Sequence, residues 1–337
     1  MPSAKTNAKK GRVFSGFRTT GRQHIGNYLG AIKNYVALQE EYDCIYCAVD
    51  VHSLTTLEDT DKLQDNIRES TLDLLAAGVH PERSILFVQS HVPEVMVLHT
   101  LLSMVTPHGW LTRVPTFKEK ARQQPENINY GLVGYPVLMT ADIVLYKADT
   151  VPVGEDQIPH LELAREIVRR FNHLFGPTFP EPQPKLTNAP LILGLDGSQK
   201  MSKSLDNHIE LAATPKETEK RVMTAVTDPQ RRYMTDPGRP EVCNVYSLHQ
   251  EFNPDKLEDI AYKCRNALRG CVECKGILAE GINRELEPFR ARRKELSEKP
   301  GYVEEVLDSG ADKARVIARE TLAEVEEKMG IRARGSA

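Results

Sequence analysis

The chain has 337 residues, of which 40% are hydrophobic and 27% are charged, and its formal net charge at pH 7 is −3. This length is enough for about two domains with separate cores, and the slightly acidic balance argues against a protein that coats nucleic acid. No apolar run reaches the roughly 18 residues needed to cross a bilayer, so we expect no membrane association. The N-terminal segment, residues 1–11, is basic but lacks the apolar stretch of a secretory signal. We expect it to be a disordered tail and the protein to be cytoplasmic.

Strand and helix patterns alternate in the first half of the chain. Short apolar runs predict strands at 13–17, 44–49 and 85–89. Apolar stripes with helical spacing predict helices at 24–42, 61–77 and 93–105. The alternation is typical of an α/β fold with a doubly wound parallel sheet, and we assign residues 12–206 to a Rossmann-like domain.

Helical patterns alone follow residue 207. The clearest of them cover 254–268 and 311–329, and we assign residues 207–337 to an all-helical domain. The segment between the two halves, 176–190, is rich in proline, and we expect an irregular, rigid connector there.

The first predicted strand leads through a glycine-rich turn into the first predicted helix, FSGFRTTGRQHIGNYLGA. The turn delivers His24 and Asn27 to the helix start, where free N–H groups favour phosphate. The glycine spacing matches neither a P-loop nor a dinucleotide-binding fingerprint. Taken alone, a histidine in this position is more often a surface residue or a helix cap than a ligand.

A second motif, LDGSQKMSKSLDN (195–207), places Lys200 and Lys203 three residues apart in a loop rich in glycine and serine. Such a loop can close over a polyphosphate and neutralise the charge that grows as pyrophosphate leaves. A single pair of lysines at this spacing is also compatible with a solvated loop.

HIGN (24–27) and KMSKS (200–204) together resemble the two signature sequences of class I aminoacyl-tRNA synthetases. With VPVGEDQ (151–157), the chain is similar to the bacterial tryptophanyl-tRNA synthetases over about residues 13–330. The resemblance implies activation of L-tryptophan with ATP and Mg2+, transfer to tRNA(Trp), and an anticodon-reading helical domain. It also implies a homodimer formed through an insertion near 105–140, where Trp110 either marks the contact or lies in the core.

The resemblance also implies which residues contact ATP. Lys120, Lys200, Lys203, His24 and Asn27 would carry the catalytic role. The nucleotide would be bound by Arg18, Thr20, Gly21, His24, Gly26, Asn27, Gly154, Asp156, Lys200, Met201, Ser202 and Lys203. Arg18 stands where other members carry glutamine, and Asn27 fills the second histidine position of the signature.

Tyr135, Met139 and Asp142 follow each other at i, i+4 and i+7, so they share one face of a helix. Related tyrosine-activating enzymes carry glutamine at the position of Met139. Asp142 is an acceptor that matches an indole N–H, which can only donate. The tryptophan site implied by the resemblance consists of Phe14, Gly16, Val49, His52, Tyr135, Met139, Asp142, Ile143 and Gln157.

Six cysteines form two groups. Cys44 and Cys47 lie in a strand, where positions three apart face opposite sides, and we expect two buried thiols rather than a metal site. Cys264 and Cys271 are two helical turns apart and are expected on one helix face, with Gly270 allowing Cys274 to fold back towards them. With Cys243 the spacing resembles that of the tryptophanyl enzymes that carry a 4Fe-4S cluster. Zinc and unligated thiols are the alternatives.

Three other functions remain open at this stage: a tyrosine-activating enzyme, an inactive synthetase-like protein that binds RNA or a partner, and another nucleotidyl-transferring enzyme. The basic segment RARRK (290–294) either contacts RNA or forms a solvated helix face.

Overall fold

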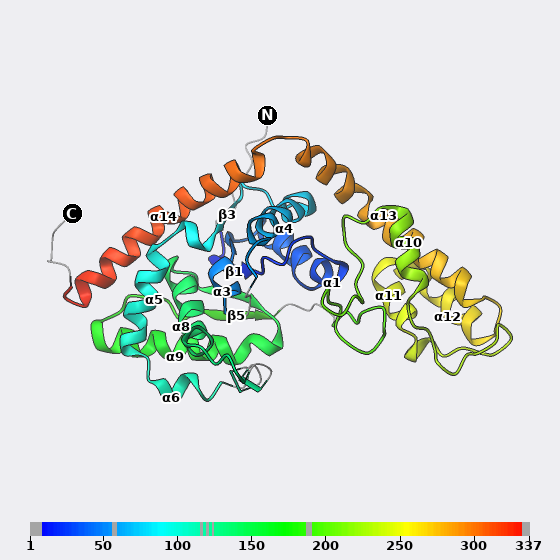
Figure 1. The fold of residues 1–337 in the computed structure, drawn as a ribbon, viewed down its shortest axis with the longest axis horizontal. Coiled ribbons are helices and arrows are strands. Elements are labelled where there is room, and N and C mark those ends of the chain that lie inside the picture. The colour runs from blue at the N-terminus through cyan, green and yellow to red at the C-terminus, as the bar shows by residue number, and fades with distance from the viewer. Residues whose placement is uncertain are drawn as a thin grey trace.

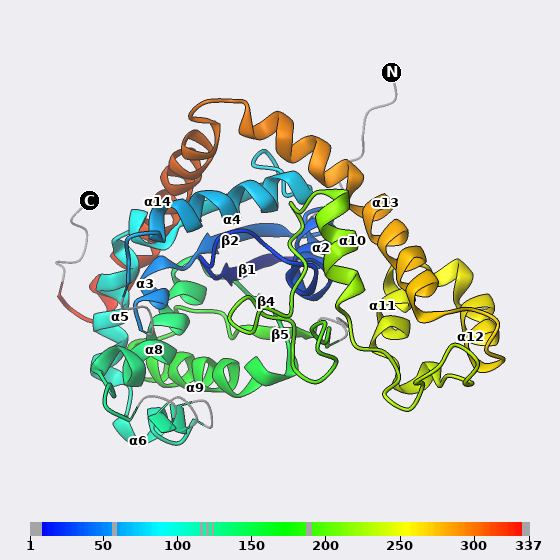
Figure 2. The ribbon, with the colours of Figure 1, turned by 45° about the vertical axis from the view of Figure 1, so that its right-hand side comes forward.

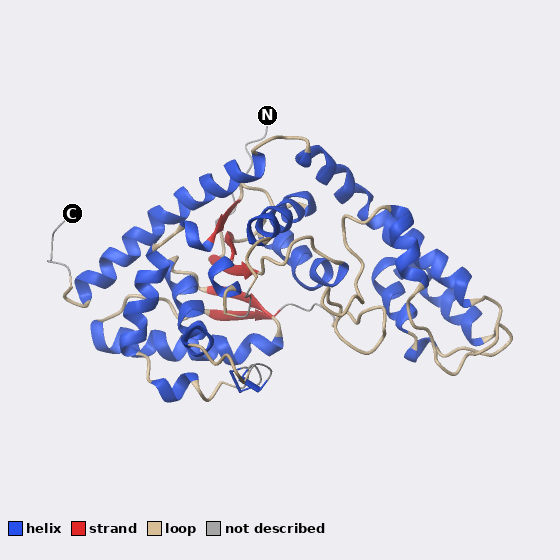
Figure 3. Cartoon of the chain, in the orientation of Figure 1, coloured by secondary structure: helices blue, strands red, loops and turns tan. Residues whose placement is uncertain are grey.

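The computed structural model describes residues 9–55, 59–114, 117–118, 121–122, 125–186 and 191–331. Within these ranges, five strands form one central sheet that is surrounded by helices (Figures 1 and 3). The strands are β1 (Arg12–Phe17), β2 (Asp43–Ala48), β3 (Ser84–Val88), β4 (Thr150–Val153) and β5 (Gln183–Leu186). Their order is β3-β2-β1-β4-β5, and all neighbours are parallel. The predicted doubly wound α/β fold is confirmed.

Helices connect the strands and then continue alone to the C-terminus. Those up to β5 are α1 (Ile25–Asn27), α2 (Lys33–Leu38), α3 (Asp50–Ser53), α4 (Leu63–Ala77), α5 (Glu94–Val105), α6 (His108–Leu111), α8 (Tyr130–Leu145) and α9 (Ile158–Phe175). Those after β5 are α10 (Pro215–Met223), α11 (Asn244–Phe252), α12 (Leu257–Arg265), α13 (Cys271–Ser297) and α14 (Tyr302–Lys328). None of the helices in the part of the chain that the structure describes could span a membrane.

Alternate residues of the central strands enter two cores, one on each face of the sheet. Val13 and Cys44 belong to the first core, whereas Phe14 and Cys47 belong to the second. This follows from the pleat of a strand, in which successive side chains point to opposite faces. The prediction that Cys44 and Cys47 are buried and face apart is confirmed, since both thiols are buried and lie in different cores.

α14 returns from the helical region and covers edge strand β3 (Figure 1). The approach is closest at Gly310, where an added Cβ would lie 1.9 Å from the carbonyl oxygen of Leu86. Only glycine permits this contact, and the helix shields an otherwise open sheet edge.

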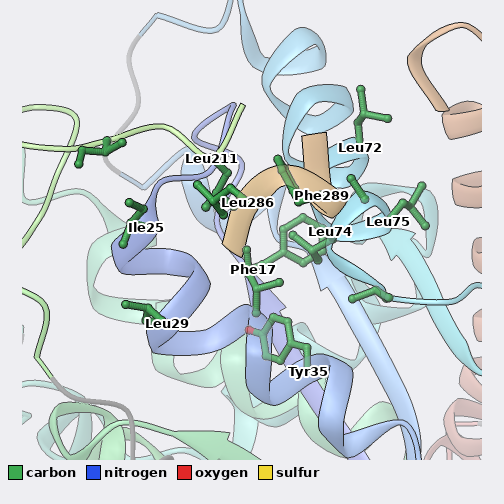
Figure 4. Packing of buried hydrophobic residues seen from close by; sticks show 14 of the residues in the cluster. Phe17, Ile25, Leu29, Tyr35, Leu72, Leu74, Leu75, Leu211, Leu286 and Phe289 are labelled. Atoms are coloured by element: carbon green, nitrogen blue, oxygen red, sulfur yellow. The ribbon is translucent and has the colours of Figure 1, made fainter. Parts of the chain in front are cut away.

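α13 runs from α12 past α10 to α4 (Figure 2). Its residues Leu286 and Phe289 pack in the first core beside Leu72 and Leu74 of α4 and Phe17 of β1 (Figure 4). The helical region and the sheet therefore share a core, and the division after residue 206 remains a prediction.

Of the predicted tail, residues 9–11 run beside the start of β2, where the carbonyl of Gly11 accepts a bond from the Asp43 N–H at 2.9 Å. Residues 1–8 lie outside the described part.

Three predicted elements need correction. The connector at 176–190 is not wholly irregular, because Gln183–Leu186 pairs with β4 at the sheet edge, where a proline is tolerated; residues 187–190 are outside the described ranges. The helix expected to reach residue 42 ends at Leu38 and contains a π-helical turn, Tyr28–Ile32. The helix expected at 254–268 is shorter, Leu257–Arg265, and begins after a 3-10 turn, Pro254–Lys256.

Candidate active site

The predicted site residues follow the carboxyl ends of the strands. HIGN comes after β1, His52 after β2, and GEDQ after β4. Because the strands are parallel, these ends meet at one edge of the sheet. The strand order reverses between β1 and β4, and ligands of doubly wound proteins bind at such a reversal.

His24 caps the first helix. Nδ1 of the His24 ring accepts the backbone N–H of Asn27 at 3.3 Å, and the backbone N–H of His24 donates to Oδ1 of Asn27 at 3.1 Å. Burial, together with the nearby His208, Lys203 and Lys200, lowers the pKa of His24 to about 4. The imidazole is therefore neutral at pH 7, as its role as an acceptor requires.

The KMSKS loop lies directly against this turn. The Lys203 ammonium donates to the carbonyl oxygen of Thr20 at 2.7 Å, and burial lowers the pKa of Lys203. Backbone bonds join Ile25 to Ile209 at 3.0 Å and Leu211 to Gln23 at 2.9 Å. The two signature segments, far apart in sequence, thus form one surface at the end of β1.

Small residues allow this close approach. An added Cβ at Gly26 would lie 3.2 Å from Cβ of Met201, which is itself buried. At Gly21, where φ is +79°, an added Cβ would lie 2.6 Å from Oδ1 of Asn66 and 3.7 Å from Nζ of Lys203. Glycine at position 26 thus lets the loop pack tightly on the turn, whereas at position 21 the positive φ and the neighbouring Asn66 of α4 favour glycine.

Asp196 and Asn207, which sequence reasoning did not single out, shape the KMSKS loop. Asp196 accepts the N–H groups of Ser198 at 2.8 Å and Gln199 at 3.0 Å, and these bonds lower the pKa of Asp196 to about 2. Oδ1 of Asn207 accepts the N–H of Ser202 at 2.7 Å. The signal was present in the sequence, since both residues flank the lysines inside the quoted motif.

Asp142 lies on α8 and is buried. Nε2 of Gln89 donates to Oδ1 at 2.9 Å and to Oδ2 at 2.8 Å, and Nε2 of His52 lies 2.9 Å from Oδ2. Among the described residues, Oδ1 thus accepts a bond only from Gln89 and keeps a free lone pair. Gln89 was missed, although it directly follows β3, where a polar side chain faces the same edge as His52.

Apolar residues of the predicted tryptophan site lie around the same strand ends. Phe14 and Ile143 belong to the second core, and Val49 and Met139 pack against it. An added Cβ at Gly16 would lie 2.8 Å from Cγ1 of Val49, so only glycine fits at position 16 beside this valine.

Some of the remaining predicted site residues form hydrogen bonds within the chain, and others are exposed. The Tyr135 hydroxyl lies 2.5 Å from Nε2 of His160, and Nε2 of Gln157 donates to Asp156 at 2.8 Å. Asp156 also approaches Gly154, where an added Cβ would lie 2.7 Å from its Oδ1. Arg18, Thr20 and Lys200 are exposed. Lys120 lies outside the described residues.

The four C-terminal cysteines line one pocket between helices, as do Arg231 and Arg269. One expectation was wrong: Cys264 and Cys271 do not share a helix. α12 ends at Arg265 and α13 begins at Cys271 after its N-cap Gly270, while Ala267 between them has a φ of +54°.

The environment of the four thiols is crowded. Burial, together with the other three cysteines, raises the pKa of Cys274 to about 12. Sγ of Cys274 lies 3.4 Å from Nε2 of His249, and Sγ of Cys264 lies 3.8 Å from Nη1 of Arg231. Over the described ranges, no three Cys, His, Asp or Glu side chains are grouped closely enough to hold one metal ion.

The sheet order and the joined HIGN and KMSKS segments define a class I aminoacyl-tRNA synthetase fold. The sequence model for tRNA synthetases class I (W and Y) matches residues 6–287. The chain is 44% identical to a tryptophan–tRNA ligase of Deinococcus radiodurans, covering 95% of this chain and 98% of the relative. It is 43% identical to the Thermotoga maritima tryptophan–tRNA ligase, covering 95% and 99%.

A solved structure agrees with these relatives. Tryptophanyl-tRNA synthetase from Campylobacter jejuni, complexed with ADP and tryptophan, superimposes with a TM-score of 0.86 at 35% identity, covering 95% of this chain and 99% of that one. The chain belongs to the bacterial tryptophanyl-tRNA synthetases.

Proposed function

We infer that the chain joins L-tryptophan to tRNA(Trp) in two steps that use ATP. The tryptophan carboxylate attacks the α-phosphorus, the bond to the bridging oxygen breaks, and pyrophosphate leaves. A terminal ribose hydroxyl of the tRNA then takes the acyl group and releases AMP. Neither step requires a nucleophile from the enzyme, so catalysis comes from positioning and electrostatics.

The position and hydrogen bonds of Asp142 are the main support for tryptophan as the substrate amino acid. Gln89 and His52 hold its carboxylate in one orientation, and the free lone pair of Oδ1 suits an indole N–H. Met139 offers a soft apolar surface where tyrosine-activating enzymes carry an amide. A phenyl side chain would leave the buried carboxylate without its partner, which would help to reject phenylalanine.

We assign the polyphosphate to the surface where HIGN meets KMSKS. Lys200 and Lys203 would neutralise the charge that develops on pyrophosphate, and the start of α1 would donate N–H groups. Bound Mg2+ would supply further positive charge at the phosphates. Arg18, Gly154, Asp156 and Gln157 would bind the nucleotide and the substrate ammonium, and Lys120 is assigned to the phosphates by resemblance alone.

Amino-acid-dependent exchange of pyrophosphate into ATP tests this function. Tryptophan should support exchange, with tyrosine and phenylalanine at least about 10²-fold poorer in kcat/KM. Preference for tyrosine would favour the tyrosine-activating alternative. Absence of exchange with every amino acid would favour an inactive protein that binds RNA or a partner.

We also propose that Cys243, Cys264, Cys271 and Cys274 bind a 4Fe-4S cluster, which would staple α11, α12 and α13. The support is that all four cysteines line one pocket with Arg231 and Arg269, whose charge would offset that of the thiolates. Anaerobically purified protein should be brown, absorb near about 400 nm and contain about four iron atoms per chain. Cys264→Ser should abolish the colour and Cys44→Ala should retain it, whereas colourless, iron-free wild-type protein would contradict the proposal.

A homodimer and a cytoplasmic location remain proposals. Met104, just before the predicted 105–140 insertion, and Tyr130, within it, are 72% and 67% exposed, and such apolar surface favours a partner. Light scattering should give twice the chain mass, and Met104→Glu should shift the protein towards the monomer. A wild-type monomer at micromolar concentration would contradict the dimer.

A further inference from the structure

A buried ion-pair network connects α13 to α4. Nε of Arg293 lies 2.6 Å from Oδ1 of Asp73, and Nη2 of Arg293 lies 2.5 Å from Oε2 of Glu69. The Asp73 side chain is fully buried and that of Arg293 is 13% exposed. A carboxylate without solvent needs a partner, and the planar guanidinium can bind both acids at once, which an ammonium cannot do in the same geometry.

The second oxygen of Asp73 reaches the first signature turn. Oδ2 accepts the backbone N–H of Gln23 at 2.6 Å, and Gln23 directly precedes His24. The carbonyl of Gln23 accepts the N–H of Leu211, which follows the KMSKS loop, at 2.9 Å. The peptide groups on both sides of Gln23 are therefore held, one by α4 and one by the strand-like segment after the loop.

A second branch reaches the neighbouring residue. Glu69 accepts from Nε of Arg22 at 2.9 Å, and Nη1 of Arg22 lies 3.7 Å from Oε2 of Glu210. Residues 22 and 23, immediately before the cap of α1, are thus both bound to groups that Arg293 contacts.

These contacts also bear on the two interpretations of the basic segment 290–294. Arg293 is committed to α4, and Arg290 donates to Oδ1 of Asn283 at 2.8 Å and to Oγ1 of Thr218 at 2.9 Å. Arg292 lies 3.4 Å from Nδ1 of His80. The arginines are used inside the chain, which favours an internal role over a free RNA-binding patch.

We propose that Arg293 is a positioning residue for ATP. It keeps Asp73 charged and oriented, Asp73 fixes the Gln23 peptide, and this peptide sets the position of His24 and the start of α1 against Lys203. The helical region thereby takes part in building the nucleotide site. The proposal rests on the proposed function, because it assigns the HIGN turn to ATP.

Pyrophosphate exchange with Arg293→Gln, compared with wild type, tests the proposal. We expect kcat/KM for ATP to fall about 10- to 100-fold, as for a small misplacement of a binding group. KM for tryptophan should stay within about twofold, because Asp142 and its partners do not contact the network. Arg293→Lys should restore only part of the loss, since it cannot bind Asp73 and Glu69 together.

Arg319→Gln is the matched control. Arg319 on α14 also ties a C-terminal helix to the sheet region, with Nε 2.8 Å from Oε1 of Glu94 on α5, but it contacts neither the HIGN turn nor Glu69 and Asp73. It should leave KM for ATP unchanged. Circular dichroism and the melting temperature show that each variant is folded at the assay temperature.

Glu69→Gln provides a second route if Arg293→Gln does not fold, because Glu69 is 26% exposed and its loss leaves the Asp73 pair intact. It should raise KM for ATP about two- to fivefold by freeing Arg22. Folded variants with wild-type ATP kinetics, or equal losses for ATP and tryptophan, would overturn the proposal. Wild-type protein without tryptophan-dependent exchange would instead overturn the proposed function.

Discussion

Replacing Asp142 by asparagine should weaken recognition of the indole while keeping the fold. The substituted amide would retain the shape of the side chain but only one oxygen, for which Gln89 and the indole N–H would compete. A hydrogen bond to a charged group contributes about 1.5–3 kcal/mol. At about 1.36 kcal/mol per tenfold, kcat/KM for tryptophan should fall about 10- to 150-fold.

The assay is pyrophosphate exchange at varied tryptophan, with benzothienylalanine, in which sulfur replaces the ring N–H, as a second substrate. The wild type should discriminate strongly between the two amino acids and Asp142→Asn only weakly. Asp43→Asn is the control, because Asp43 pairs with Arg12 at the opposite end of the sheet. Unchanged discrimination in Asp142→Asn would refute the role of Asp142 as the indole acceptor.

Three further predictions concern the phosphate site and the helix contacts. Lys203→Ala should reduce the exchange rate about 10²- to 10³-fold, because it removes positive charge from the leaving pyrophosphate; an undiminished rate would exclude this lysine from catalysis. Because the pKa of His24 is lowered to about 4, the unfolded chain binds more protons between about pH 4 and 6.5, and stability should rise with pH across that window. His24→Asn should flatten this rise by at most about 3 kcal/mol in urea unfolding, and superimposable profiles would contradict the shift. Gly310→Ala should destabilise the protein by about 2–4 kcal/mol, since its Cβ would overlap the Leu86 carbonyl, whereas Gly276→Ala, in open space on α13, should stabilise it by up to about 1 kcal/mol; equal effects would disprove the tight α14–β3 contact.

Local patterns in the sequence were sufficient for three of the five described strands, and the segments that form β4 and β5 were not predicted as strands. β1, β2 and β3 are short apolar runs, and their predicted positions were confirmed to within one residue at each end. β5 was missed because Pro184 and Pro182 oppose a strand locally, and only pairing with β4 makes Gln183–Leu186 extended. The helix break between Cys264 and Cys271 was missed for a similar reason, since a seven-residue spacing fits a helix until the chain reverses at Ala267.

For the site, too, local sequence patterns predicted some residues and missed others. Asp142, His52 and the signature motifs could be named from residue type and spacing, because each carries its chemistry in a short segment. Asp196 and Asn207 lie inside the KMSKS motif and could have been named with it. Gln89 acts by binding Asp142 from the end of another strand, and Arg293 acts from a helix more than 200 residues away from Asp73 in the chain. Such partners depend on the tertiary packing of distant elements and leave no local pattern.

Aminoacylation of purified tRNA tests the central claim most directly. Wild-type protein, ATP and Mg2+ should charge tRNA(Trp) with tryptophan, and should leave tRNA(Tyr) uncharged with either tryptophan or tyrosine. Charging of tRNA(Tyr) with tyrosine, or no charging of tRNA(Trp) by protein that binds ATP, would contradict the account.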